Sequence, residues 1–189
     1  MQAATPNCWW IRSGSRKAGL AAWAGQVRCH PMTDPTESPF FRDADREDLT
    51  AIIELLADDP LGALRELLTN PLPQSYLDAF DAISADPNNR LIVAVLGGQI
   101  AGTMQLTFLP GLSHQGSWRC QIEGVRISKS FRSQGVGRRM IEWAIGQAAE
   151  RGCSFVQLTS DKTRSDALRF YENLGFKASH EGMKLRLED

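Results

Sequence analysis

The spacing of apolar residues predicts alternating helices and strands from residue 39 onward. In some stretches apolar residues recur every three or four positions, which is typical of amphipathic helices, and in others they alternate or run continuously over strand length. The predicted helices cover residues 45–56, 60–68, 73–85, 140–148 and 165–174. The predicted strands cover residues 39–42, 90–96, 99–108, 120–127, 155–159, 176–180 and 183–187.

One predicted strand, residues 120–127, has a fault in its alternation. Ile122 is apolar on one parity, whereas Val125 and Ile127 are apolar on the other, so the phase slips at Glu123-Gly124. A β-bulge, which adds one residue to a strand, would explain the slip, and glycine is common at bulges. A bulge here would leave backbone groups free for a ligand. The alternative is that Gly124 is a core position without space for a side chain.

The strand with the fault leads into a glycine-containing loop and then a helix. The loop reads Arg132-x-x-Gly135-x-Gly137 and precedes the helical pattern of Met140. The first N–H groups of a helix lack internal partners, and the helix dipole adds positive charge there. Glycine lets the backbone approach a phosphate closely. The loop is therefore predicted to bind the pyrophosphate of a coenzyme, at the carboxyl end of a strand in a parallel βαβ unit.

Composition narrows the classes of function. The 189 residues suit one domain with an extension, and the net charge of −1 argues against nucleic acid or an anionic membrane as a partner. No apolar run approaches the ~20 residues of a membrane span. The four cysteines are scattered, so no metal site or disulfide framework is predicted, and a cytoplasmic location is expected.

Residues 1–37 differ from the domain predicted for residues 38–189. They contain no acidic residue before Asp34 and keep no helical or strand period. A transit peptide is one interpretation. The other is that the first 31 residues are upstream sequence and that Met32 is the natural start, so that a chain starting at Met32 would fold and work like the full chain.

Two motifs resemble the GNAT superfamily of acyl-CoA-dependent N-acyltransferases. The first is Val125-Arg126-Ile127 running into Arg132-Ser133-Gln134-Gly135-Val136-Gly137-Arg138, which is similar to the family's Q/R-x-x-G-x-G/A coenzyme A loop. The second is residues 167–176, ALRFYENLGF, which is similar to the family's A-x-x-F-Y-x-x-x-G-F helix. The resemblance covers the chain from Pro39 to its end.

The resemblance implies an α/β fold with a mixed, mostly antiparallel sheet, a central splayed parallel strand pair and flanking helices. It implies an N-acetyltransferase that moves an acetyl group from acetyl-CoA to a primary amine of a small molecule or peptide, without a metal. Acetyl-CoA would lie in the split of the sheet, with its pantetheine arm on the main chain of Val125 and Ile127. The implied coenzyme-binding residues are Val125, Arg126, Ile127, Arg132, Ser133, Gln134, Gly135, Val136, Gly137, Arg138 and Arg164.

Two side chains are candidates for catalysis. Glu123, beside the predicted bulge, would accept the amine proton directly or through water; alternatively it pairs with Arg126 or with the helical arm before residue 86. Tyr171 matches the family's general acid and would protonate the leaving thiolate; alternatively it is a packed aromatic. Arg164 stands where many members have Asn, so it is expected either to reach a coenzyme phosphate or to face solvent.

The expected partners are acetyl-CoA and an amine acceptor, with a homodimer left open. A non-catalytic acyl-CoA-binding or regulatory module on the same fold is the rival function.

Overall fold

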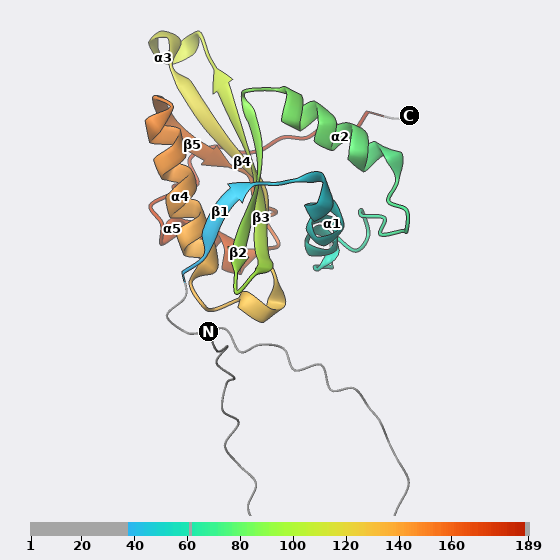
Figure 1. Cartoon of the computed structure of the whole chain (residues 1–189). Coiled ribbons are helices and arrows are strands. Elements are labelled where there is room, and N and C mark those ends of the chain that lie inside the picture. The colour runs from blue at the N-terminus through green and yellow to red at the C-terminus, as the bar shows by residue number, and fades with distance from the viewer. Residues whose placement is uncertain (1–37, 61, 188–189) are drawn as a thin grey trace, which may run out of the picture. The chain divides into compact units, whose positions relative to one another are not determined.

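The computed structural model describes residues 38–60 and 62–187, which fold around a five-stranded sheet (Figure 1). The strands, in their order across the sheet, are β1 (Phe40–Asp43), β2 (Asn89–Leu96), β3 (Gln99–Pro110), β4 (Trp118–Ile127) and β5 (Cys153–Leu158). Neighbours from β1 to β4 are antiparallel, and β4 and β5 are parallel. This arrangement confirms the predicted fold class. The predicted extension, residues 1–37, lies outside the described residues.

Helices cover both faces of the sheet. The longer helices are α1 (Leu49–Ala57), α2 (Gln74–Ala85), α4 (Val136–Glu150) and α5 (Ser165–Glu172). The short helical turns are η1 (Arg46–Asp48), α3 (Ser113–Gly116) and η2 (Lys129–Phe131). Figure 1 shows α1 and α2 on one side of the sheet and α4 and α5 on the other. No helix among the described residues combines the length and apolarity needed to cross a membrane.

Each face of the sheet has its own apolar core. The larger core joins Met104 and Leu106 of β3 to Met140 and Ile141 of α4. The smaller core joins Ile52 of α1 to the β2 residues Val93 and Val95. Successive strand residues point to opposite faces, which explains why β2 is a continuous apolar run: it is buried on both sides.

The start of α1 is fixed by charged groups. The Asp48 carboxylate accepts a hydrogen bond from the Asp45 backbone N–H at 2.8 Å. Arg42 donates to both oxygens of the same carboxylate, at 2.6 and 3.0 Å. Together these contacts anchor the first turn to β1, and they satisfy an N-terminal backbone donor as a capping box does.

Two predictions of local structure are wrong. Pro60 and residues 62–65 form turns and residues 66–68 are irregular; Leu64 and Leu67 are exposed, so their helical spacing has no core to face. The predicted strands 176–180 and 183–187 are not formed, and Met183, Leu185 and Leu187 are 95%, 87% and 82% exposed. In both cases the apolar side chains have no surface to pack against. Regular spacing alone does not stabilise a helix or a strand.

Candidate active site

The predicted β-bulge is present in β4. Glu123 pairs with Gln105 and Arg126 pairs with Thr103, so three steps along β4 match two steps along β3. Gly124 has φ +60°, and a Cβ added there would meet only a Leu56 methyl at 3.9 Å. Backbone conformation, and not lack of space, therefore explains the glycine.

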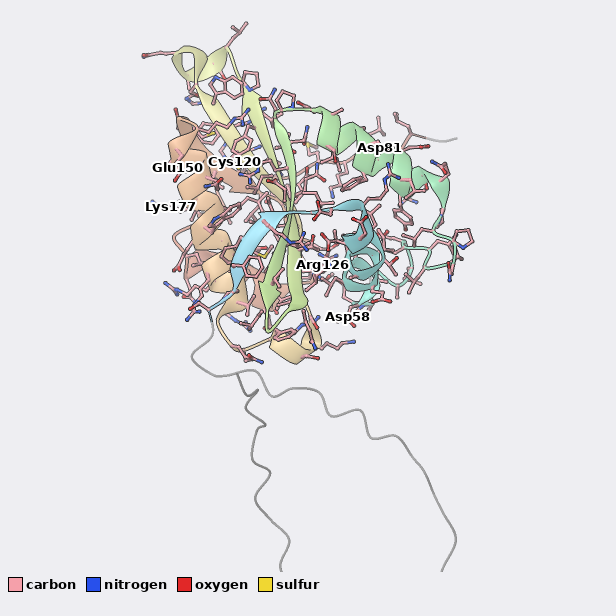
Figure 2. All side chains as sticks on the ribbon, in the orientation of Figure 1. Asp58, Asp81, Cys120, Arg126, Glu150 and Lys177 are labelled. Carbon is pink, nitrogen blue, oxygen red and sulfur yellow. The ribbon has the colours of Figure 1, made fainter. Side chains whose placement is uncertain are left out.

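The bulge brings two charged residues to the same face of the sheet. Without it, Glu123 and Arg126 would point to opposite faces, because they are three positions apart. Their partners Gln105 and Thr103 are two positions apart, so they and the residues opposite them share a face. This face is the one covered by α1, since Met104, between those partners, packs into the core on the α4 side. Figure 2 shows Arg126 on the α1 side of the sheet.

The parallel pair β4–β5 separates where the bulge begins. Its last paired residues are Ile122 and Leu158, and no residue of β5 pairs with Glu123–Ile127. The predicted coenzyme contacts Val125, Arg126 and Ile127 all lie in this half of β4. On its β5 side, this half of the strand therefore has main-chain groups with no partner on β5.

The predicted phosphate loop, residues 132–137, lies between β4 and α4. Ser133 and Gly135 have left-handed φ values of 63° and 78°, and Gly135 is the N-cap of α4. Alternating left-handed residues at a helix start turn successive N–H groups toward one concave side, which suits an anion. Gly137 faces β4 and α5: a Cβ there would make ordinary contacts with Ile127 at 3.5 Å and Phe170 at 3.6 Å, so α4 packs beside both elements at this position.

The side chains around this loop are held by ion pairs and hydrogen bonds. Arg132 donates to the Ile127 carbonyl at 3.0 Å and to Asp58 at 3.1 Å. Lys129 lies 2.5 Å from the other oxygen of Asp58. The loop is therefore tied to the C-terminal end of α1, which carries Asp58.

Two more predicted coenzyme residues point along the surface. Gln134 donates to the Ser130 carbonyl at 2.8 Å, and Arg138 pairs with Glu142 one turn further along α4. Val136, in contrast, is buried in the larger core. The backbone of these residues, more than their side chains, borders the concave side of the loop.

Tyr171 is fixed by the end of α5. Gly175 donates to the Glu172 carbonyl and Phe176 donates to the Tyr171 carbonyl, which is the Schellman pattern that the sequence predicts. The Tyr171 ring packs against Phe170 and Phe176, with centroids 5.1 and 5.8 Å away. Burial raises the pKa of Tyr171, and the positive charges of Arg164 and then Arg126 oppose that rise. The phenol therefore keeps its proton at neutral pH, as a general acid requires.

Arg126 and Arg164 meet at a half-buried carboxylate, Asp59. Arg126 Nε lies 3.0 Å from Asp59 Oδ2, and Arg164 pairs with the same oxygen. The other oxygen, Oδ1, accepts a hydrogen bond from the Gly62 backbone N–H at 2.7 Å. Burial lowers the pKa of Arg126, while the charge of Asp59 raises it. The alternative that Glu123 pairs with Arg126 does not hold, because Arg126 pairs with Asp59 and Glu123 is exposed.

Asp58 and Asp59 are site residues that the sequence analysis missed. Their partners lie 67 to 105 positions further along the chain, so no local pattern connects them. One signal was available. Two carboxylates follow α1 directly, where the negative end of the helix dipole disfavours them. An unfavourable local placement of this kind indicates a tertiary reason.

These features fit a thioester coenzyme with a pyrophosphate. The left-handed loop at Ser133 and Gly135 can hold the pyrophosphate, and the half of β4 beyond Ile122 has main-chain groups for an amide-bearing arm. Tyr171 stands on the helix that packs against the same loop. No cluster of three or more metal-ligating side chains occurs within residues 38–60 and 62–187.

The model of the Acetyltransferase (GNAT) family matches residues 49–176. The chain belongs to this family. As a member of this family, the chain is an acetyltransferase. The family uses acetyl-CoA as its acetyl donor.

Relatives agree with the family. The aminoalkylphosphonate N-acetyltransferase of Salmonella typhimurium is 31% identical over 142 residues, which cover 71% of this chain and 92% of the relative. The glucosamine 6-phosphate N-acetyltransferase of Trypanosoma brucei brucei is 33% identical over 90 residues, which cover 48% of this chain and 59% of the relative. A crystal structure of a transcriptional regulator from Bacillus halodurans is 53% identical, with a TM-score of 0.77, and the match covers 79% of this chain and 100% of that one.

Proposed function

We propose that this GNAT protein transfers the acetyl group of acetyl-CoA to the primary amine of a small molecule. The observation that carries the proposal is the bulge in β4 at the point where β4 and β5 separate. It leaves main-chain groups of β4 without a partner on β5, where the coenzyme would bind, and it presents Glu123 on the face of the sheet opposite α4.

The proposed reaction is a direct attack. The amine nitrogen forms a bond to the acetyl carbonyl carbon, the bond from that carbon to sulfur breaks, and the products are an N-acetyl amine and the free thiol of coenzyme A. Glu123 accepts a proton from the bound ammonium, directly or through water, and the neutral amine that results is the nucleophile. A backbone N–H near Val125 stabilises the negative charge that develops on the carbonyl oxygen. Tyr171 donates a proton to the departing sulfur.

The coenzyme contacts are assigned by position. The main chain of Val125 and Ile127 would hold the pantetheine arm. The backbone N–H groups from Ser133 to Arg138 would hold the pyrophosphate, with Gly135 giving close approach. Arg132 lies beside this loop and can add a charge to it once it exchanges its contact with Asp58. Arg126 and Arg164 face the side of α1, so their guanidinium groups are not assigned to the coenzyme.

The names of two relatives support a small-molecule acceptor. One acts on aminoalkylphosphonates and the other on glucosamine 6-phosphate. Each acceptor is an amine that also carries a phosphorus oxyanion.

The proposal is tested by the release of free coenzyme thiol from acetyl-CoA, measured with a panel of small amines, amino acids and peptides. We expect turnover with small amines that exceeds the rate of spontaneous thioester hydrolysis. Binding of acetyl-CoA without turnover on any amine would contradict the proposal.

That second outcome would favour a non-catalytic, acyl-CoA-responsive regulatory module. One observation supports this alternative, namely the name of the 53% identical Bacillus halodurans structure, a transcriptional regulator. The Glu123→Gln variant tests the catalytic part of the proposal, because an enzyme that uses Glu123 as its base loses turnover while it keeps its affinity for the coenzyme.

A further inference from the structure

The face of the sheet opposite the coenzyme helix carries a base and a cation in one row. Glu123 and Arg126 share this face only because the bulge inserts a residue between them. Val125 and Ile127, on either side of Arg126, pack toward the core that contains α4. The guanidinium of Arg126 therefore points to the side from which an acceptor would approach, and away from the predicted pyrophosphate loop.

Arg126 is a poorly solvated cation, and its hydrogen bonding with its partner Asp59 is incomplete. Its side chain is only 19% exposed. Its Nε lies 3.0 Å from Asp59 Oδ2, yet the Nε–H makes no aligned hydrogen bond with any residue in the described ranges. Its Nη1 donates to the Val125 carbonyl at 2.9 Å. Arg164 takes the same carboxylate oxygen. A single carboxylate oxygen thus serves two guanidinium groups, although each could bind an oxyanion through two N–H donors.

Two other ionisable side chains, Glu66 and Tyr171, lie near Arg126. Glu66 is close enough to raise the pKa of Arg126, but it also accepts a hydrogen bond from the Tyr76 hydroxyl at 2.9 Å. Tyr171 lies near both arginines, and their charges act on its pKa. Both guanidinium groups therefore lie near the predicted general acid, and Arg126 also lies near Glu66 in residues 62–85.

We propose that Arg126 and Arg164 form a subsite for an anionic group on the acceptor. The preferred acceptor is then a small primary amine that carries a phosphonate or phosphate. The proposal rests on the proposed function and adds the class of its acceptor. A dianion with three oxygens offers separate oxygens to the two guanidinium groups, and it replaces the oxygen of Asp59 that they share.

The spacing of the site fits such a molecule. Three strand residues span about 10 Å, less the shortening at the bulge. Glu123 and Arg126 lie on the same face of the sheet, so both groups are approached from one side. An amine near Glu123 and an oxyanion at Arg126 can therefore belong to one molecule with a few bonds between the two groups.

The experiment compares acceptors that differ in the anionic group. Initial rates of thiol release from acetyl-CoA are measured with 2-aminoethylphosphonate, the carboxylate analogue β-alanine, and the uncharged amine 2-methoxyethylamine. We expect kcat/KM to be at least about 30-fold higher for the phosphonate than for the uncharged amine, since binding at two guanidinium groups is worth a few kcal/mol. An equal preference for β-alanine would assign the subsite to carboxylates and overturn the phosphorus class.

Variants locate the subsite. We expect Arg126→Gln to lower the ratio of kcat/KM between phosphonate and uncharged amine by about tenfold or more. Arg164→Gln, which leaves the pair of Arg126 with Asp59 in place, should lower the same ratio by a smaller factor. Arg169→Gln removes an equal charge from α5, where Arg169 pairs with Asp166, and serves as the control. A ratio near one in the unaltered protein, or a ratio that neither Arg126→Gln nor Arg164→Gln changes, would overturn the proposal.

A binding measurement separates this proposal from the proposed function. Methylphosphonate carries the oxyanion but no amine, and its binding is followed by calorimetry in the presence of coenzyme A. Binding that is lost in Arg126→Gln but kept in Arg169→Gln supports the subsite even where no amine is acetylated. Turnover of amines without any binding of methylphosphonate supports the acetyltransferase reaction and rejects the subsite.

Discussion

At the scale of single residues, the site depends on how well Tyr171 is held. Its ring contacts two phenylalanines, and its carbonyl accepts the Schellman hydrogen bond from Phe176. These contacts leave the phenol little freedom to turn. The backbone and the ring of Tyr171 make these contacts, so the hydroxyl can be removed without loosening the end of α5.

Tyr171→Phe removes the proton donor and keeps the ring. We expect kcat to fall by about 100-fold or more, since general acid catalysis typically contributes at least that much. The affinity for coenzyme A should stay within about twofold, because the ring contacts remain. Steady-state rates together with calorimetric titration of coenzyme A check both parts. An unchanged kcat would remove Tyr171 from the acid role.

The pH dependence of the reaction follows from the same residue. Burial raises the pKa of Tyr171 above its ordinary value near 10, so the phenol stays protonated throughout the neutral range. We therefore expect kcat/KM to rise with pH as the acceptor amine loses its proton, with no descending limb below about pH 10. A descending limb that begins near pH 8 in the unaltered protein, and that is absent in Tyr171→Phe, would mean that the phenol pKa is lowered instead.

At the scale of elements, the bulge of β4 decides which residues face the acceptor. Gly124 has φ +60°, a conformation that costs other residues roughly 1–2 kcal/mol. Space is available for a methyl group at this position, so backbone strain is the only penalty that the structure indicates. The glycine therefore tests the bulge without a steric clash.

Gly124→Ala should either strain the bulge or shift the register of β4. We expect the free energy of unfolding to fall by about 1–2 kcal/mol and kcat to fall more than tenfold, because Glu123 and Arg126 no longer share a face. Gly146→Ala is the matched control, since Gly146 lies inside α4 with open space around its Cβ and an ordinary φ. Urea unfolding and steady-state kinetics of both variants provide the comparison, and full activity of Gly124→Ala would count against the bulge as a catalytic device.

The junction of β1 with α1 makes a separate contribution to stability. Arg42 lowers the pKa of Asp48 through its hydrogen bonds, with burial acting in the opposite direction. A carboxyl group with a lowered folded-state pKa stabilises the fold above its unfolded pKa, near 3.9, and loses this contribution as the pH falls through the folded value.

We therefore expect Asp48→Asn to lower the free energy of unfolding by about 2 kcal/mol at pH 7. The difference from the unaltered protein should shrink below about pH 4. Urea titrations at pH 7 and pH 3 test this expectation. An equal difference at both pH values would show that the effect is steric and not ionic.

The elements that the sequence predicted correctly have local signals. The bulge was visible as a slip in alternation at Gly124, and the end of α5 as Gly175 followed by an apolar residue. The elements that it predicted wrongly, residues 60–68 and the two C-terminal strands, have the right period but no surface to pack on. The contacts of Asp59 with Arg126 and Arg164 were beyond prediction, because they join segments that only the folded sheet brings together.

At the scale of the whole molecule, the outer edge of β5 and the C-terminal segment 183–187 are the two features that favour association between chains. In the sheet order, β5 has a neighbour on one side only, so its other edge leaves backbone groups without a strand partner in the described sheet. The segment 183–187 alternates apolar and charged residues as a strand does, and its apolar side chains are almost fully exposed. Open edges and exposed apolar alternation both favour association between chains.

We propose that the homodimer that the sequence leaves open depends on the segment 183–187. The double variant Leu185→Lys with Leu187→Lys should be monomeric at concentrations where the unaltered protein is dimeric, because it removes the apolar side of the segment. Light scattering after size-exclusion chromatography, over a range of protein concentrations, gives both masses. Exchanging Lys184 for Gln, on the other side of the segment, changes charge without this loss and is the control. A monomer for the unaltered protein would reject the homodimer, and an unaltered dimer in the double variant would move the interface elsewhere on the molecule.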